Sequence, residues 1–382
     1  MNIDKRFPSV AEMEAAAGRR MPKFVHEYMI GGIGVEACVQ RNRDALNGVL
    51  LMPRYLSDAQ KPDIRAKLLG YEFDAPFGVA PMGLSGLMWP DLERILASAA
   101  RAHKIPYVLS TYACASLERV KPVAGEMGWF QYYPSSTPAV EQDLLDRCKA
   151  AGYQTIVLTV DIPVETRRAR DFKSGLSVPP RFDLRTLYQM ITRPTWAWGM
   201  LRMGVPDFET LKPYYPPGRS IHTSVEFISK SMKGHITAER FKTIRAAWDG
   251  DLLVKGVLDV EEAKTYLALG ADGIIVSNHG GRQFDAAPTP VDVLPKMRAA
   301  LGKEVPIMAD GGIRHGLDIA RILALGADFV FLGRPFVYAV AAIGKKGGAH
   351  VMHVLKEELK MTLAQMGCTT LAQLPDFLIS DS

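Results

Sequence analysis

Short apolar runs alternate with helical stretches through most of this sequence, from Phe77 onward. Eight runs can be counted, at residues 77–83, 107–111, 129–133, 155–161, 252–257, 273–279, 305–312 and 329–334. Several of the stretches between them have apolar residues at i, i+3 and i+4 and end in glycine, which is typical of amphipathic helices. Eight alternating strand and helix signals with nearly continuous apolar strands predict a (β/α)8 barrel in preference to an open doubly wound sheet.

Polar residues or glycines follow each apolar run, where the predicted strand ends. They are Met82 and Gly83, Ser110, Gln131 and Tyr133, Thr159 and Asp161, Lys255, Ser277 and His279, Asp310 and Gly311, and Gly333 and Arg334. The carboxyl ends of barrel strands meet at one mouth, where such folds carry their chemistry. Core packing alone would not place polar residues at all eight ends, so we expect a single site there.

The sixth run carries the most informative of these ends, in the sequence GIIVSNHGGRQ at 273–283. Gly280 and Gly281 allow a tight turn that would bring His279 and Arg282 to one pocket. A neutral imidazole beside a guanidinium suits a reaction in which the cation holds a substrate carboxylate while the histidine takes a proton. An isolated histidine would more often be a satisfied loop residue, but this cluster favours a functional site.

The last two strand ends predict a phosphate site. ADGGIRHG at 309–316 and LGRPF at 332–336 place glycines and arginines after the seventh and eighth strands, where barrels often bind phosphate. Backbone N–H groups of Gly312 and Gly333, with Arg314 and Arg334, could bind its oxygens. No GxGxxG opens a βαβ unit, which argues against a nicotinamide bound in a Rossmann domain.

Composition excludes several classes of protein. The 382 residues are 48% hydrophobic, enough for a large core, and we expect one domain over 1–382. The four cysteines are far apart, which predicts reduced thiols in a cytoplasmic protein and no zinc site. The first residues lack a signal-peptide core, and no run of eighteen apolar residues is present. A net charge of +5 without a basic block gives no reason to expect nucleic acid as a partner.

Two segments lie outside the alternation of predicted strands and helices. Residues 1–60 predict a helical N-terminal extension in which Tyr28 just precedes a glycine stop, where it could be a half-buried aromatic. Residues 164–235 form an insertion after the fourth strand that is too long for an ordinary connection. Its middle mixes apolar side chains, Trp196, Trp198, Met200, Leu201, Met203, Tyr214 and Tyr215, with the cations Arg181, Arg185, Arg193, Arg202, Lys212 and Arg219. Such a mixture suits an anionic membrane surface, and the alternative is a lid or a subunit contact.

Six motifs together resemble the FMN-dependent α-hydroxy acid dehydrogenase and oxidase family. They are SNHGGRQ at 277–283, LTVDIP at 158–163, QYYP at 131–134, LVKG at 253–256, ADGGIR at 309–314 and LGR at 332–334. Within the family, RPTWAWGM at 193–200 and AAWDGDLLVKG at 246–256 are most similar to bacterial L-lactate dehydrogenases. Glycine at Gly83 resembles the dehydrogenase members, whereas Tyr112 stands where glycolate oxidase has tryptophan.

The resemblance assigns roles to individual residues. It implies that His279 is the base and Asp161 its orienting carboxylate, and that Arg282, Tyr28 and Arg168 bind the substrate carboxylate. Tyr133 would bind the substrate hydroxyl, and Lys255 would lie near flavin N1 and O2, although a snorkelling surface lysine is the alternative. The remaining FMN contacts implied are Ala80, Pro81, Met82, Ser110, Gln131, Thr159, Ser277, Asp310, Gly311, Gly312, Arg314, Gly333 and Arg334.

The expected activity is oxidation of an (S)-2-hydroxy acid, with L-lactate foremost, to the 2-oxo acid. Electrons would pass through FMN to a membrane quinone or cytochrome, from a homotetramer peripheral to the inner face of the cell membrane. His279 could remove the Cα proton, or the hydroxyl proton while hydride moves. Alternatives are an oxidase that reduces oxygen, an (S)-mandelate-type dehydrogenase and a non-catalytic phosphate-binding barrel. A metal hydrolase is disfavoured because the strand ends lack clustered His and carboxylate ligands.

Overall fold

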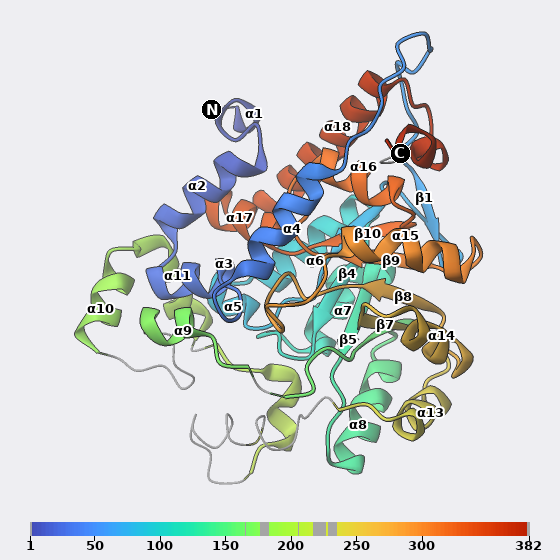
Figure 1. Cartoon of the computed structure of the whole chain (residues 1–382). Coiled ribbons are helices and arrows are strands. Elements are labelled where there is room, and N and C mark those ends of the chain that lie inside the picture. The colour runs from blue at the N-terminus through green and yellow to red at the C-terminus, as the bar shows by residue number, and fades with distance from the viewer. Residues whose placement is uncertain are drawn as a thin grey trace.

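The computed structural model describes residues 2–164, 166–175, 183–204, 206–216, 227 and 235–379. In this part of the chain, parallel strands close into a barrel in the order β10-β3-β4-β5-β6-β7-β8-β9 (Figure 1). Their bounds are β3 Phe77–Val79, β4 Tyr107–Ser110, β5 Gly128–Tyr132, β6 Thr155–Thr159, β7 Asp251–Val257, β8 Gly273–Val276, β9 Ile307–Asp310 and β10 Phe329–Leu332. The predicted barrel is therefore confirmed, and each strand falls within or beside one of the predicted apolar runs.

Helices follow the barrel strands as the periodicity predicted. They are α5 Ser85–Met88, α6 Leu92–Ala102, α7 Leu117–Ala124, α8 Pro138–Ala150, α13 Ala238–Ala247, α14 Val260–Ala268, α15 Pro290–Leu301, α16 Gly316–Ala324, α17 Arg334–Ile343 and α18 Gly347–Met366, with short 3-10 turns η1 Gly125–Met127 and η3 Leu371–Phe377. Side-chain oxygens of Ser116, Thr237, Asp259 and Thr289 cap the first turns of α7, α13, α14 and α15. Such caps satisfy amide groups that would otherwise have no partner.

Alternation along the barrel strands decides which side chains face the mouth. Successive side chains point to opposite faces of a strand, so every second residue faces the barrel interior. The lower interior positions are apolar and form one cluster that includes Val108, Trp129, Val157, Leu253, Ile275, Met308 and Phe331. Two residues further along the same strands stand Ser110, Gln131, Thr159, Lys255, Ser277, Asp310 and Gly333. A polar layer therefore lies directly above an apolar plug.

A hairpin that the periodicity did not predict closes the amino end of the barrel. Strands β1 Ala66–Leu68 and β2 Tyr71–Phe73 pair antiparallel. The ring of Phe73 contacts those of Trp129 and Phe329, with centroids 6.2 and 5.4 Å away. Three-residue strands are too short to give a recognisable alternation, so only packing against the barrel reveals them.

The N-terminal extension is helical, as predicted, and part of it reaches the barrel mouth. It contains α1 Ile3–Arg6, α2 Val10–Arg20, α3 Lys23–Ile30 and α4 Ala37–Gly48. Helix α2 packs along α17, while α3 and the turn after it approach the loop that follows β8 (Figure 1). The extension thus contributes to the site as well as covering the barrel.

The described part of the insertion contains α9 Ala169–Ser174, α10 Leu184–Ile191, α11 Pro194–Met203 and the 3-10 turn η2 Glu209–Tyr214. The predicted apolar set does not form one surface. Trp196 and Met200 are buried, and the Trp196 indole donates to the carbonyl oxygen of Leu87 at 3.0 Å. The hydroxyls of Tyr214 and Tyr215 bond to Asp143 and Asp207 at 2.5 and 3.1 Å. These four side chains pack on the same protein, as the alternative of a lid implies for this part of the insertion. Arg181 and Arg219 lie outside the described residues.

An exposed apolar surface does exist on the insertion, and most of it comes from residues outside that set. We call it the α10–α11 face; its members are Leu184, Leu187, Tyr188, Ile191, Trp198, Leu201 and Met203. The four from α10 follow helical spacing and therefore share one side of that helix. Within the described ranges, no helix combines the length and apolar character that crossing a bilayer requires.

Candidate active site

A cavity of ≈ 700 Å³ opens at the carboxyl ends of the barrel strands. Its walls contain every predicted site residue except Asp161 and Ser277, namely Tyr28, Ala80, Pro81, Met82, Ser110, Gln131, Tyr133, Thr159, Arg168, Lys255, His279, Arg282, Asp310, Gly311, Gly312, Arg314, Gly333 and Arg334. A second groove, of ≈ 910 Å³, lies beside Arg54 and Arg321 and contains none of them. The predicted residues therefore converge on one place.

His279 is oriented by Asp161. Its Nδ1 atom lies 3.0 Å from both carboxylate oxygens of Asp161, and its backbone N–H donates to the Ser277 hydroxyl at 3.0 Å. The φ angle of His279 is 56°, in the left-handed region that a residue with a side chain rarely occupies. A proton on Nδ1 that is shared with the carboxylate leaves Nε2 as the proton acceptor. The strained turn thus fixes a base at the edge of the cavity.

Burial and charge set the protonation of this pair. Burial lowers the pKa of His279, and the opposing influence of Asp161 does not fully compensate, so the neutral imidazole is favoured. Burial alone would raise the pKa of Asp161, but its pairing and hydrogen bond with His279 and the positive charge of Lys255 outweigh burial, so the pKa is lowered. A neutral base beside an ionised carboxylate is the arrangement that general-base chemistry needs at neutral pH.

Gly256 explains how Asp161 reaches this position. Its φ angle is +104°, and a Cβ atom there would lie 2.6 Å from the Cβ of Asp161. The register between β7 and β8 also shifts at this point. Only glycine lets the loop after β6 pass so close to β7, so the LVKG motif contributes its glycine as well as its lysine.

Lys255 is held in the floor of the cavity. It is 3% exposed, and its ammonium lies 3.0 Å from the Ser277 hydroxyl and 3.2 Å from an Asp310 carboxylate oxygen. Burial alone would lower its pKa, but Asp310 and Asp161 outweigh burial and the pKa is raised. Lys255 is therefore a charged, oriented cation and not a snorkelling surface lysine. Ser277 lies behind the cavity wall, where its hydroxyl joins Lys255, Asp310 and the His279 backbone.

Three cationic or aromatic groups gather beside His279. Arg282 lies 4.9 Å from the ring centroid of Tyr28, and Arg168 lies 5.9 Å from the same centroid. Arg282 Nη1 donates to backbone carbonyl oxygens of Tyr28 and Gly31, and its guanidinium also interacts with the Tyr28 side chain. The Nε atom of Arg168 is buried without a partner among the described residues. The cluster has donors to spare for an anion.

After β9 and β10, Arg314 and Arg334 form a second anion-binding subsite. Both side chains have lowered pKa values, chiefly because they are buried, and the neighbouring charges of Arg314 and Arg282 contribute to a pKa of about 9 for Arg334. Like charges in a low-dielectric site repel one another, and a bound anion would relieve that repulsion. The predicted phosphate site after β9 and β10 therefore has the charge that it requires.

Phe208 and Asp171 line the cavity and were not predicted, whereas the sequence places Tyr112 where glycolate oxidase has tryptophan. Tyr112 stacks on Tyr133 with ring centroids 4.8 Å apart, and Phe208 packs edge-on against Tyr112 at 5.7 Å. Phe208 belongs to the insertion, far from the barrel motifs in sequence, and no local pattern indicates that it reaches the cavity. Asp171 lies in the same wall, three residues after Arg168.

The barrel and its mouth define an enzyme of the (β/α)8 class with adjoining proton-acceptor and anion subsites. The sequence pattern of the FMN-dependent dehydrogenase family matches residues 17–381. An L-lactate dehydrogenase from Ectopseudomonas mendocina is 37% identical over 369 residues, covering 96% of this chain and 97% of the relative. An L-lactate dehydrogenase from Vibrio cholerae is 36% identical over 364 residues, which cover 95% of this chain and 96% of the relative.

Solved structures agree with this relationship. An (S)-mandelate dehydrogenase described as a monotopic membrane protein superimposes with a TM-score of 0.92 at 34% identity, covering 98% of this chain and 99% of that one. A mandelate oxidase superimposes with a TM-score of 0.80 at 33% identity, with coverage of 96% and 97%. The chain belongs to the FMN-dependent dehydrogenase family, and the expected family, enzyme class and cofactor are confirmed.

The cavity fits FMN. Gln131 Nε2 and Thr159 Oγ1 are buried without hydrogen-bond partners among the described residues, and both line the cavity. Orphaned buried polar atoms are costly unless a ligand satisfies them. A flavin ring offers polar atoms for these two groups, while its phosphate matches Arg314 and Arg334.

Proposed function

We propose that this enzyme oxidises a small (S)-2-hydroxy acid, with L-lactate as the leading substrate, to the corresponding 2-oxo acid. The observation that carries the proposal is that His279, which Asp161 orients, lines the same cavity as the cations Arg282 and Arg168. A proton acceptor and a carboxylate site side by side match the two ends of a 2-hydroxy acid. FMN, when bound, supplies the acceptor for the two electrons.

Individual side chains bind the substrate and accept its proton. Arg282 and Arg168 bind the substrate carboxylate, with Tyr28 beside it, and thereby set the position of the hydroxyl and the α-hydrogen. Nε2 of His279 accepts the proton, and Asp161 stabilises the imidazolium that results. Tyr133 donates to the substrate hydroxyl, and the charge of Lys255 favours an electron-rich ligand on the cavity floor. His279 can serve either route, removal of the Cα proton or of the hydroxyl proton.

Two observations bear on the substrate. The L-lactate dehydrogenase relatives support a short side chain. The aromatic wall of Tyr112 and Phe208 favours a second candidate, an aryl 2-hydroxy acid such as (S)-mandelate, because aromatic rings pack edge-on or offset against one another. The mandelate dehydrogenase likeness points the same way.

For the electron acceptor, we propose a membrane quinone or cytochrome, reached from the inner face of the cell membrane. The α10–α11 face provides apolar contact, and Arg185 and Arg202 flank it with positive charge. A structural relative is described as monotopic, which supports the same placement. Reduction of oxygen, as in an oxidase, is the alternative. A homotetramer stays a prediction.

Anaerobic bleaching of the bound flavin tests the function. We expect L-lactate to reduce the purified holoenzyme faster than glycolate, (S)-mandelate or longer-chain acids, and D-lactate to leave it oxidised. Reoxidation should then be faster with a soluble quinone than with air. Faster bleaching by (S)-mandelate would favour the aryl substrate, and fast reoxidation by air would favour an oxidase. A preparation that no 2-hydroxy acid bleaches would refute the proposal.

A further inference from the structure

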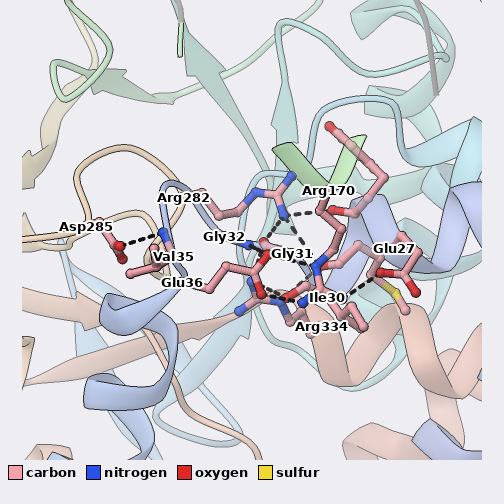
Figure 2. Close-up of polar contacts among 12 residues, drawn as sticks. Glu27, Ile30, Gly31, Gly32, Val35, Glu36, Arg170, Arg282, Asp285 and Arg334 are labelled. Atoms are coloured by element: carbon pink, nitrogen blue, oxygen red, sulfur yellow. Dashed lines mark hydrogen bonds and ion pairs between the residues drawn. The ribbon is translucent and has the colours of Figure 1, made fainter. Parts of the chain in front are cut away.

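Arg170, on α9 of the insertion, binds two carboxylates from different segments. Its Nε donates to Glu36 Oε1 at 2.7 Å, its Nη2 pairs with Glu36 Oε2, and its Nη1 donates to Glu27 Oε2 at 2.6 Å (Figure 2). The side chains of Arg170, Glu27 and Glu36 are 34%, 19% and 23% exposed. Bidentate, partly buried pairs of this kind are stronger than exposed surface pairs.

The two carboxylates hold a tight turn between α3 and α4. Glu27 lies on α3 next to Tyr28, and Glu36 precedes α4 and accepts from the Gly32 N–H at 3.2 Å. A Cβ atom on Gly31 would lie 3.0 Å from Cδ of Arg170 and 2.9 Å from the carbonyl oxygen of Glu27. The turn therefore lies directly against Arg170, and the absence of a side chain on Gly31 leaves space for the Arg170 side chain.

Two cavity arginines hold the same turn from the other side. Arg282 Nη1 donates to the carbonyl oxygens of Tyr28 and Gly31 at 2.8 and 2.7 Å, and Arg334 Nη2 donates to that of Gly31 at 3.1 Å. Figure 2 shows the three guanidiniums arranged around the Ile30–Gly32 backbone. The carbonyl end of a helix attracts cations, so α3 is fixed where Tyr28 enters the cavity.

Arg168 lies close to Arg170 along the chain and has its own ion pair with Asp171 at 3.8 Å. Arg168 immediately precedes α9, two residues before Arg170, and its guanidinium faces the Tyr28 ring. Among the ion pairs of the described residues, those of Arg170 are the ones that join α9 to α3 and to the turn. One guanidinium outside the cavity thus links two groups inside it.

We propose that Arg170 is a positioning residue for the substrate carboxylate, because its pairs with Glu27 and Glu36 hold Arg168 and Tyr28 in one arrangement. The inference rests on the proposed function and extends it to a residue that does not line the cavity. If the pairs break, both carboxylate-binding groups gain freedom, while the His279–Asp161 pair and Arg314 keep their own supports. Affinity for the carboxylate should fall more than the chemical step.

The variants Arg170→Ala and Arg170→Lys test this, with Arg65→Ala as the matched control. Arg65 also forms a bidentate pair, with Asp63 beside the hairpin at the amino end of the barrel. Steady-state kinetics with the best 2-hydroxy acid give KM and kcat, and titration with oxalate, followed by the flavin spectrum, gives a dissociation constant. FMN affinity and the melting temperature are measured on the same samples.

We expect Arg170→Ala to raise KM and the oxalate dissociation constant about tenfold, as misplaced positioning groups do, with kcat within about threefold of the parent. Arg170→Lys should recover part of the loss, because a lysine supplies the charge but not the two-sided geometry. Arg65→Ala should leave both constants unchanged.

Unchanged oxalate binding in Arg170→Ala would overturn the inference, and so would parallel losses of kcat, FMN affinity and melting temperature, which indicate a merely structural role. A parent enzyme that oxidises no 2-hydroxy acid would instead refute the proposed function, so the two failures can be told apart.

Discussion

His279 combines an unusual backbone with a defined protonation. Its left-handed φ angle is kept by the Ser277 hydroxyl on one side and by Asp161 on the other. Non-glycine residues in this region cost about 1–3 kcal/mol, and such strain is often stored at functional sites. The free Nε2 then faces the cavity in a fixed direction, which is what a general base needs.

Replacing this base should slow the chemistry without emptying the cavity. We expect His279→Gln to reduce the rate of anaerobic flavin reduction by about 10²- to 10⁴-fold, because a positioned general base contributes that much. FMN content should be unchanged, since Arg314 and Arg334 are untouched. Stopped-flow absorbance gives the rate, and near-parental reduction by the variant would remove His279 from the mechanism.

The pH dependence should report the same imidazole. Burial lowers the pKa of His279, so the neutral, base-competent form persists below the ordinary value of 6.5. As pH falls through that lowered pKa, the imidazole becomes protonated and kcat/KM should fall. In Asp161→Asn, the acid limb of the kcat/KM profile should move to still lower pH, because the carboxylate that raises the pKa of His279 is gone. The maximal kcat/KM of this variant should also fall. A limb that moves upward in this variant would contradict the assignment.

Helices of the insertion serve two surfaces. Residues Trp196 and Met200 of α11 pack on the protein body, and the indole of Trp196 meets Phe24 of α3 with ring centroids 6.0 Å apart. The other side of the same segment forms the exposed α10–α11 face. Loss of a whole helix would therefore disturb the body, so the membrane proposal is better tested by changing exposed side chains alone.

The combined variant Leu184→Gln, Leu187→Gln, Tyr188→Gln and Ile191→Gln should weaken membrane binding. Each apolar side chain transferred from water contributes about 1.5–3 kcal/mol when fully buried, so even partial insertion predicts a drop of about tenfold or more in partition. Cosedimentation with phosphatidylglycerol vesicles measures it, and kcat with a soluble dye should stay at the parental value.

The matched control is Tyr55→Gln with Leu56→Gln, which alters another exposed apolar pair, in the loop between α4 and β1. It should leave vesicle binding unchanged. Equal binding by the α10 variant and the parent would argue for a lid or a subunit contact at this face.

At the scale of the whole molecule, the barrel mouth gathers several buried guanidiniums. Burial is the main cause that lowers the pKa of Arg282, Arg314 and Arg334, and a neighbouring arginine lowers each further: Arg168 for Arg282, Arg43 for Arg314, and Arg314 with Arg282 for Arg334. The fold therefore carries an electrostatic cost at the mouth that a bound phosphate or carboxylate would offset.

The stability of the apoprotein should respond to the phosphate of the cofactor. A ligand at 100 times its Kd adds about 2.7 kcal/mol to the free energy of unfolding. We expect FMN to raise the melting temperature clearly and riboflavin at the same concentration to raise it much less, because riboflavin lacks the phosphate. In the Arg314→Met variant, the increases in melting temperature produced by FMN and by riboflavin should differ less than in the parent. Differential scanning fluorimetry measures this, and equal stabilisation of the parent by both ligands would argue against the phosphate subsite.

Local sequence was sufficient to determine the barrel and most of the cavity wall. Continuous apolar runs, helical stretches with period 3.6 and polar strand ends are short-range signals, and a closed parallel barrel brings all strand ends together. Hence the sequence alone predicts that Lys255, His279, Asp310 and Arg334 share one barrel mouth, and all four line the same cavity.

Tertiary structure alone decided what depends on contacts between distant segments. Nothing near Arg170 indicates that it would pair with Glu27 and Glu36 while Arg168 turns to the cavity, because three arginines within four positions look alike in sequence. The split of the insertion's apolar residues into buried and exposed sets has the same origin. Which face of a helix is buried depends on the elements that pack against it. The β1–β2 hairpin at the amino end of the barrel makes the same point, because its three-residue strands are stabilised by packing on the barrel core.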